Sequence, residues 1–189
     1  MKRVLSTCLV FTTVMLSCAY GVEVNENQTG KSTKWYLVGG LLHYTNSSDR
    51  NVGDGQGIYG SVGIQFTRTF GIEFIVDYVP EHEPVSPEQD QATPIRSGLK
   101  AKNHVANSLT GTIRTNVRDT LMIVGKLGIA GYRYDLDEED DGGVSFVGSI
   151  GIDVPLGESD DWSIEVSITQ LFSAETDGTS LIAGLKYSF

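Results

Sequence analysis

The chain has 189 residues, a net charge of −10 at pH 7 and 22 glycines. An acidic chain without a basic patch excludes nucleic-acid binding, because such binding depends on neutralising phosphates. After residue 21, no run of about 18 consecutive apolar residues occurs, which excludes a membrane-spanning helix.

The first 21 residues are predicted to form a secretory signal peptide. Lys2 and Arg3 give a positive start, and residues 4–16 form an apolar run broken only by Ser and Thr. Small residues then permit cleavage after Ala19 or after Gly21. We therefore expect export across the inner membrane.

Both cysteines, Cys8 and Cys18, lie inside this segment, so the mature chain is expected to have no disulfide and no cysteine metal site. The residues before Cys18 depart from a lipobox, so lipidation is not expected. Residues 22–33 are predicted to be a short periplasmic lead, and residues 34–189 a single barrel domain.

Alternating apolar and polar residues predict an all-β fold, and specifically an eight-stranded antiparallel up-and-down transmembrane barrel. Most expected strands have 11 or more residues, which suits tilted membrane strands of ~9–11 residues better than globular strands of ~5–6. The expected ranges are 34–44, 56–66, 69–79, 104–117, 120–135, 143–155, 161–173 and 179–189.

The third of these segments illustrates the alternation. Phe70, Ile72, Phe74, Val76 and Tyr78 share one face, opposite Gly71, Glu73, Ile75 and Asp77. The other segments also pair an apolar face with a small or polar one, except the first. That segment is apolar on both faces, so the pattern does not orient it.

Aromatic residues decide between a membrane barrel and a soluble secreted barrel, the alternative that alternation alone leaves open. They gather near one set of strand ends, as an interfacial girdle would. These residues are Phe66, Phe70, Trp162, Tyr187 and Phe189.

The predicted connections alternate in length, which is typical of short periplasmic turns and longer extracellular loops. The expected short connections are 67–68, 117–119 and 156–160, and the longer ones are 45–55, 80–103, 136–142 and 174–178. Both chain ends are then expected on the periplasmic side.

Three stretches resemble the OmpA-type family of small outer-membrane barrels. Residues 71–78 and 121–135 resemble its third and fifth strands, while Gly184, Tyr187 and Phe189 resemble its C-terminal assembly signal. The resemblance implies a monomer in a Gram-negative outer membrane that contacts lipopolysaccharide and is inserted by the barrel-assembly machinery. The family's peptidoglycan-binding domain is not expected here.

If the small-residue faces point inward, the lumen holds seven charged side chains. They are Glu73, Asp77, Arg114, Lys126, Asp153, Glu165 and Lys186. Side chains just fill an eight-stranded lumen, so buried charges there must pair. By resemblance, Glu73 and Lys126 would join the family's network of paired charges. The lumen is then either closed by paired charges or a gated narrow ion pathway.

Two predicted loops are candidates for binding an extracellular ligand. Loop 80–103 holds four of the five prolines and is the longest. Loop 135–142 is strongly acidic and imitates the first half of a calcium-binding loop, but position 148 is Gly rather than the required Glu. Two interpretations of this acidic loop stay open. It is either simply solvated, or it is bridged by divalent cations to lipopolysaccharide phosphates.

Catalysis is the third class of function considered. The run from His43 to Asn46 partly resembles the His-x-Ser-Asn run of lipid A deacylases, but Thr45 replaces the Ser and no Glu partner is evident. His82 is expected in a loop and His104 at a strand end, so neither a metal site nor a cofactor is expected. We expect a non-catalytic structural or adhesin-like barrel, with a narrow porin-like channel as the alternative and a lipid A-modifying enzyme third.

Overall fold

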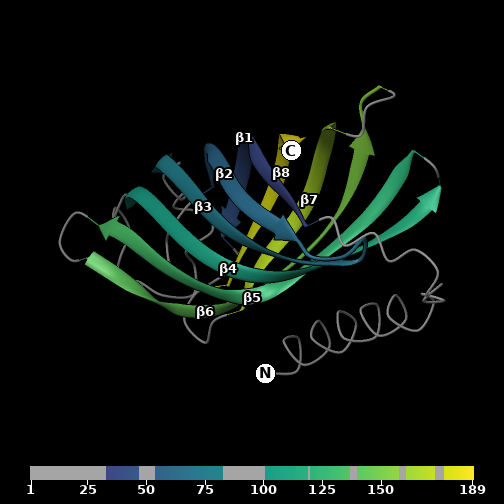
Figure 1. Ribbon diagram of the computed structural model, residues 1–189. Coiled ribbons are helices and arrows are strands. Elements are labelled where there is room, and N and C mark those ends of the chain that lie inside the picture. Colours follow the sequence, from purple (N-terminus) through teal and green to yellow (C-terminus); the bar gives the residue numbers. More distant parts are fainter. Residues whose placement is uncertain are drawn as a thin grey trace.

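The chain folds into eight β-strands that curve around a common axis (Figure 1). The computed structural model describes residues 33–46, 54–82, 101–118, 120–136, 140–157, 161–172 and 177–189. The signal peptide and lead predicted for residues 1–33 therefore lie almost wholly outside the described residues. The strands are β1 Lys34–Asn46, β2 Gly55–Gln65, β3 Phe70–His82, β4 Ala101–Arg118, β5 Leu121–Leu136, β6 Asp140–Pro155, β7 Trp162–Phe172 and β8 Asp177–Ser188.

Each strand pairs antiparallel with its neighbours in the sequence, and β1 also pairs with β8, which closes the barrel. At the seam, the Trp35 amide donates to the Phe189 carbonyl at 3.2 Å, and the Phe189 amide donates back at 2.9 Å. The predicted eight-stranded closed barrel is confirmed. No helix long and apolar enough to cross a membrane occurs in the described part of the chain.

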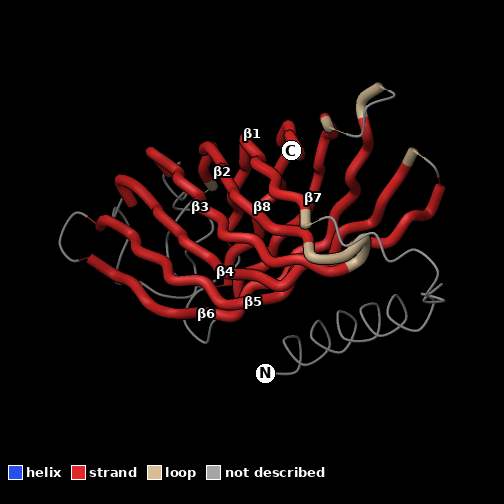
Figure 2. The backbone as a smooth tube through the Cα atoms, in the orientation of Figure 1, coloured by secondary structure: helices blue, strands red, loops and turns tan. Residues whose placement is uncertain are grey.

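The barrel has two different ends, visible in Figure 2. At the short-turn end, the connections 66–69, 119–120 and 156–161 join neighbouring strands. In the first of these turns, the Thr67 hydroxyl accepts hydrogen bonds from the amides of Thr69 and Phe70, at 3.2 and 2.9 Å. We call the opposite end, where the remaining connections lie, the loop end.

At the loop end, several strands run further than predicted, including β3, which pairs with β2 there, and β4, which pairs with β5. β3 continues to His82 and β4 begins at Ala101, so the predicted loop 80–103 is too long at both ends. β5 and β6 leave only residues 137–139 between them, so the loop predicted over 136–142 is also wrong in its bounds. Local composition favours turns at these places, whereas pairing with the adjacent strand extends the ladder.

The outward face is an apolar band. On β3 every second side chain from Phe70 to Tyr78 is exposed, and these are the five apolar residues of the predicted face. Eight steps of about 3.3 Å, tilted by about 40°, give this band a height of roughly 20 Å, close to the ~25 Å of an outer-membrane barrel. At the short-turn end, the rings of Trp162 and Tyr187 lie 4.7 Å apart, and those of Tyr187 and Phe189 lie 5.9 Å apart.

Pairing with β2 and β8 settles the orientation of β1, which the sequence pattern left open. Trp35, Leu37 and Leu41 are exposed on the outside. The inward residues include two tyrosines that reach into the lumen. These inward residues are Tyr36, Val38, Leu42 and Tyr44.

A glycine makes room for one of these tyrosines. Tyr36 pairs directly with Gly63 of β2, and a Cβ added at Gly63 would clash with the Tyr36 ring. The ring therefore lies flat against the neighbouring strand and places its hydroxyl deep in the lumen. Nearer the loop end the interior is mainly apolar, with Leu42, Val79 and Leu171 all buried.

Candidate functional site

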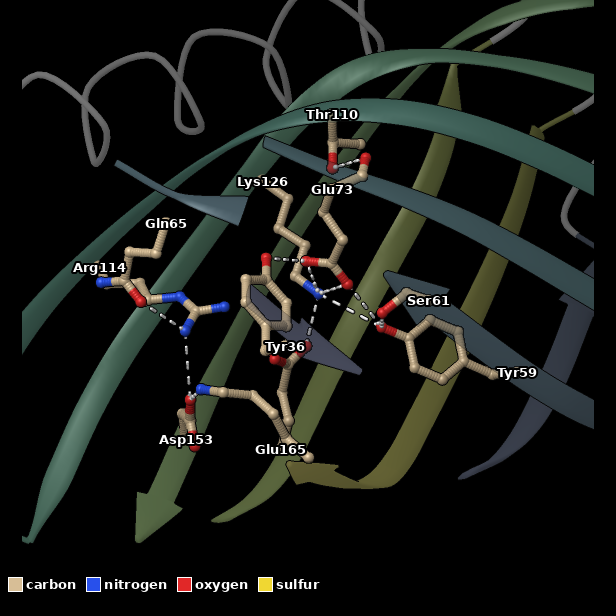
Figure 3. Close-up of polar contacts among 11 residues, drawn as sticks. Tyr36, Tyr59, Ser61, Gln65, Glu73, Thr110, Arg114, Lys126, Asp153 and Glu165 are labelled. Atoms are coloured by element: carbon tan, nitrogen blue, oxygen red, sulfur yellow. Dashed lines mark hydrogen bonds and ion pairs between the residues drawn. The ribbon is translucent and has the colours of Figure 1, made fainter. Parts of the chain in front are cut away.

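The first feature of the lumen is a buried lysine held between two glutamates (Figure 3). Nζ of Lys126 lies 2.9 Å from Glu73 Oε2 and 2.6 Å from Glu165 Oε1. The Tyr36 hydroxyl donates to Glu73 Oε2 and the Tyr59 hydroxyl to Glu73 Oε1, each at 3.0 Å. We call these residues the Lys126 cluster. All three charged side chains are at most 2% exposed, so their charges depend on one another rather than on water.

A second group lies nearer the short-turn end, and we call it the Asp153 cluster. Oδ2 of Asp153 is bonded by Nζ of Lys186 and lies 3.9 Å from Nη1 of Arg114. Arg114 Nη1 also donates to Gln65 Oε1 at 3.2 Å, and its guanidinium carbon lies 4.4 Å from the centre of the Tyr36 ring. Two cations thus share one carboxylate and one aromatic face.

All eight strands contribute to these two clusters. In chain order the contributing residues are Tyr36, Tyr59 with Gln65, Glu73, Arg114, Lys126, Asp153, Glu165 and Lys186. Because each comes from a different part of the wall, their side chains converge across the lumen (Figure 3).

The charges of the two clusters compensate each other. The Lys126 cluster has two carboxylates and one ammonium group, and the Asp153 cluster has two cations and one carboxylate. Their net charges are therefore −1 and +1. Opposite net charges in a medium of low dielectric attract more strongly than in water, which favours keeping the two clusters together.

Several polar atoms around the clusters have no hydrogen-bond partner among the described residues. In a polar protein interior, ordered water normally satisfies such groups. They are Nε and Nη2 of Arg114, Oδ1 of Asp153, Oε2 of Glu165, and the hydroxyls of Ser149 and Ser163. The chemistry available here is ion pairing and hydrogen bonding.

Asp77 is the predicted lumen residue that stays outside both clusters. It lies on β3, paired with Tyr59 of β2 and Ala106 of β4. It is half-buried as a residue, while its Oδ1 is buried and has no partner in the described part of the chain.

Two histidines meet near the loop end, although no sequence pattern connects them. His82 ends β3 instead of lying in a loop, and both His82 and His104 are buried. Their ring centres lie 6.1 Å apart, and Tyr44 lies 5.6 and 5.0 Å from them. Within the described ranges, no group of three or more His, Cys, Asp or Glu is placed to hold a metal ion.

The other predicted positions are distributed as follows. Gly184 is buried, whereas Tyr187 and Phe189 are exposed on the outside at the short-turn end. His43 also points outward, and its partners across the sheet are Gln56 and Leu181. The side chains of residues 134–141 lie outside the part that the structure describes.

Sequence reasoning missed the polar partners of the charges. Tyr59 and Gln65 shared the predicted inward face of their strand, but no role followed from that. Tyr36 could not be oriented at all. An inward Tyr on each of two adjacent strands, opposite an inward Glu, would have been the available signal.

Comparison of sequences defines the class of protein that carries this lumen. Residues 10–189 match the family described as "Outer membrane protein beta-barrel domain". The chain belongs to this family, and it is an outer-membrane β-barrel of Gram-negative bacteria. The resemblance to small OmpA-type barrels is thereby confirmed. No curated protein matches the chain significantly.

Solved structures share the fold. Ail, the attachment invasion locus protein of Yersinia pestis, crystallised with the heparin analogue sucrose octasulfate, is 11% identical, with a TM-score of 0.59 over 84% of this chain and 99% of its own. The N-terminal barrel of Pseudomonas aeruginosa OprF is 10% identical, with a TM-score of 0.58 over 84% and 100%. OprG from Pseudomonas aeruginosa is 11% identical, with a TM-score of 0.58 over 84% and 97%.

Proposed function

We propose that this protein is a non-catalytic outer-membrane barrel whose lumen is closed and which acts through its outer surface and loops. The observation that carries the proposal is the convergence of side chains from all eight strands on the two ion clusters. Side chains nearly fill an eight-stranded lumen, and ion pairs across it oppose the passage of solutes. If the lumen is closed, binding must take place at the membrane-facing surface and at the loops.

Contact with lipopolysaccharide is supported by a polar row on the outside, near the loop end. Thr45 pairs with Thr179, and Thr179 pairs with Gln170, whose Oε1 accepts a 2.6 Å hydrogen bond from the Thr179 hydroxyl. His43 and Gln56 continue the row on β1 and β2. Hydroxyl, amide and imidazole groups just beyond an apolar band suit the polar headgroups of the outer leaflet.

An adhesin-like role rests on the loops. Loops at one end of a rigid barrel are the usual place for variable binding functions. The segment 135–142 has six acidic residues among its eight, in a chain of net charge −10. This charge argues against a heparin analogue such as the sucrose octasulfate crystallised with Ail, and favours a basic partner or one bridged by divalent cations.

The lack of a catalytic role is supported by the surroundings of His43. Lipid A deacylation needs a carboxylate near the histidine, whereas its partners across the sheet are Gln56 and Leu181. Thr45 stands where such a site has serine. Neither cross-strand partner supplies a carboxylate that would support His43 as a general base.

A narrow channel is the second candidate, and one observation favours it. Lys126 is shared by two carboxylates, so its ammonium group has two alternative partners. Movement to one of them would break a bond across the lumen. The unsatisfied hydroxyls of Ser149 and Ser163 would then line a hydrated path.

Planar-bilayer conductance of the refolded protein separates the two candidates. A closed barrel gives no discrete channel events, and Glu73→Gln lowers its stability without opening it. A channel gives events whose conductance changes in both Glu73→Gln and Lys126→Gln. The exposed Lys34→Gln variant on the rim is the matched control. Steady conductance of the wild type would replace the closed-lumen proposal with the channel.

The adhesin-like part is tested on bacteria that produce the full chain or a version lacking residues 83–100. If the loops bind, the deletion reduces adhesion to surfaces coated with extracellular matrix, while the barrel still shows its heat-dependent shift in gel mobility. Equal adhesion of both strains would leave only the structural role.

A further inference from the structure

Asp77 is the one interior carboxylate among the described residues that has no ion-pair partner. It lies on the interior face of β3 between Ile75 and Val79, which are 6% and 0% exposed. The Asp77 carboxylate has no hydrogen bond or ion pair with any described residue, and its Oδ1 is buried. The other three interior carboxylates each have an ion-pair partner within 4 Å.

The count of charges makes the same point independently. The two clusters together hold three carboxylates and three cations, so they are neutral as a unit. Asp77 adds a fourth carboxylate, so the described interior side chains carry one uncompensated negative charge. Burial of an unpaired carboxylate is strongly unfavourable, so the folded state gains from any positive charge that neutralises it.

Among the described residues, no cation near Asp77 is free to do so. The charges that act most strongly on Asp77 are Lys126 of β5 and Glu73 of its own strand. The Lys126 ammonium group is already bound by Glu73 and Glu165. Across the ladder, β2 contributes Tyr59, whose hydroxyl is bonded to Glu73.

The neighbouring strand β4 places small residues beside Asp77. The residue directly across is Ala106, and the next interior position towards the short-turn end is Ser108. A methyl group occupies little of the space that a larger side chain would fill. A serine hydroxyl adds a neutral oxygen of the type that binds alkali ions. Asp77 is half-buried as a residue, although its Oδ1 is buried.

We propose that Asp77 binds one exchangeable monovalent cation, an alkali ion or a proton, and that this cation brings the lumen to zero net charge. An alkali ion would be held by the carboxylate, water and the Ser108 hydroxyl. A proton would reside on the carboxylate itself. Both sources supply the same single positive charge, and both bind the folded barrel better than the unfolded chain.

Thermal unfolding of the refolded protein, followed by gel mobility, tests this in two arms. In the first, sodium chloride replaces N-methylglucamine chloride at constant ionic strength and pH. Each tenfold rise in sodium lowers the unfolding equilibrium constant at most tenfold for one bound ion. In the second, pH is lowered from 8 to 6 at constant sodium. If a proton is the occupant, it binds the folded barrel better than the unfolded chain, so linkage makes the barrel more stable as pH falls.

Asp77→Asn keeps the size of the side chain but removes the charge, so its unfolding should lose the wild type's response in whichever arm shows one. Glu81→Gln makes the same change at an exposed position of the same strand and should keep that response. A response in the sodium arm identifies the alkali ion, and one in the pH arm alone identifies the proton. Responses that are absent from the wild type, or unchanged in Asp77→Asn, would overturn the site.

A second measurement does not depend on the variant folding. Crystals of the wild type soaked in thallium(I), which substitutes for potassium, should show anomalous density beside the Asp77 carboxylate if the alkali ion is the occupant. Lack of such density, together with a wild type insensitive to pH and sodium, would refute the proposal. Because neither measurement involves conductance or adhesion, the outcome is independent of the proposed function.

Discussion

Replacing Lys126 with methionine should destabilise the barrel more than any other single loss of charge in the lumen. Met keeps the length of the aliphatic part of the side chain but removes the ammonium group that lies 2.9 Å from Glu73 and 2.6 Å from Glu165. Both carboxylates are at most 1% exposed, so water cannot replace the lost partner. Breaking one buried ion pair typically costs about 3–5 kcal/mol, and here two pairs share the cation, so we expect at least about 4 kcal/mol.

Urea unfolding in phospholipid vesicles measures this loss. With a slope of about 1–3 kcal/mol per molar urea, 4 kcal/mol lowers the midpoint by more than about 1 M. The two tryptophans of the chain, Trp35 and Trp162, are exposed on the outer surface, so their fluorescence reports the loss of contact with lipid. Neither tryptophan contacts the substituted lysine.

The exposed Lys34→Met variant is the control, because it removes the same charge at the rim. It should shift the free energy of unfolding by less than about 0.5 kcal/mol. Adding Glu73→Gln to the Lys126→Met variant should recover part of the lost free energy of unfolding, because the carboxylate left without a cation at position 73 becomes a neutral amide. A loss below about 1 kcal/mol for Lys126→Met would refute the view that the ion pairs hold the lumen together.

Three further predictions concern packing and the membrane. Gly63→Ala should lower the free energy of unfolding in urea by about 1–3 kcal/mol, because the added methyl group displaces the tyrosine ring packed against it. A methyl group added at Gly39 meets no atom within 4 Å, so Gly39→Ala should lower it by less than about 1 kcal/mol. Lipids brominated near the headgroups should quench the fluorescence of Trp35 and Trp162 more than lipids brominated at the bilayer centre. The opposite order would refute the interfacial position of these aromatic residues. Deleting Phe189 should lower the yield of inserted barrel in cells, measured by gel mobility, and an unchanged yield would remove its role as an assembly signal.

Much of the fold could be predicted because membrane strands obey a local rule. Residues two apart share a face, so the alternation from Phe70 to Tyr78 predicts an outward apolar face without any knowledge of the neighbouring strands. The same rule put Glu73 and Lys126 on inward faces before their strands were paired. Strand ends were less predictable, because pairing with a neighbour carried β3 past Pro80 to His82.

The partners of the charges could not be predicted in the same way. Glu73 and Lys126 are far apart in the sequence, and which carboxylate the lysine meets depends on how strands are staggered around the barrel. Stagger arises from closure, in which β1 pairs with β8 in one particular register. The same register orients Tyr36, whose strand is apolar on both faces.

The sequence by itself determined that the chain forms a membrane barrel and which of its charges point inward, because alternate side chains of a strand lie on opposite faces. Only the tertiary structure decided that six of those charges form two compensating clusters, that Asp77 has no ion-pair partner among the described residues, and that His82 meets His104. Those facts depend on distances across a closed lumen, and contacts between side chains of distant strands produce no periodic pattern in the sequence.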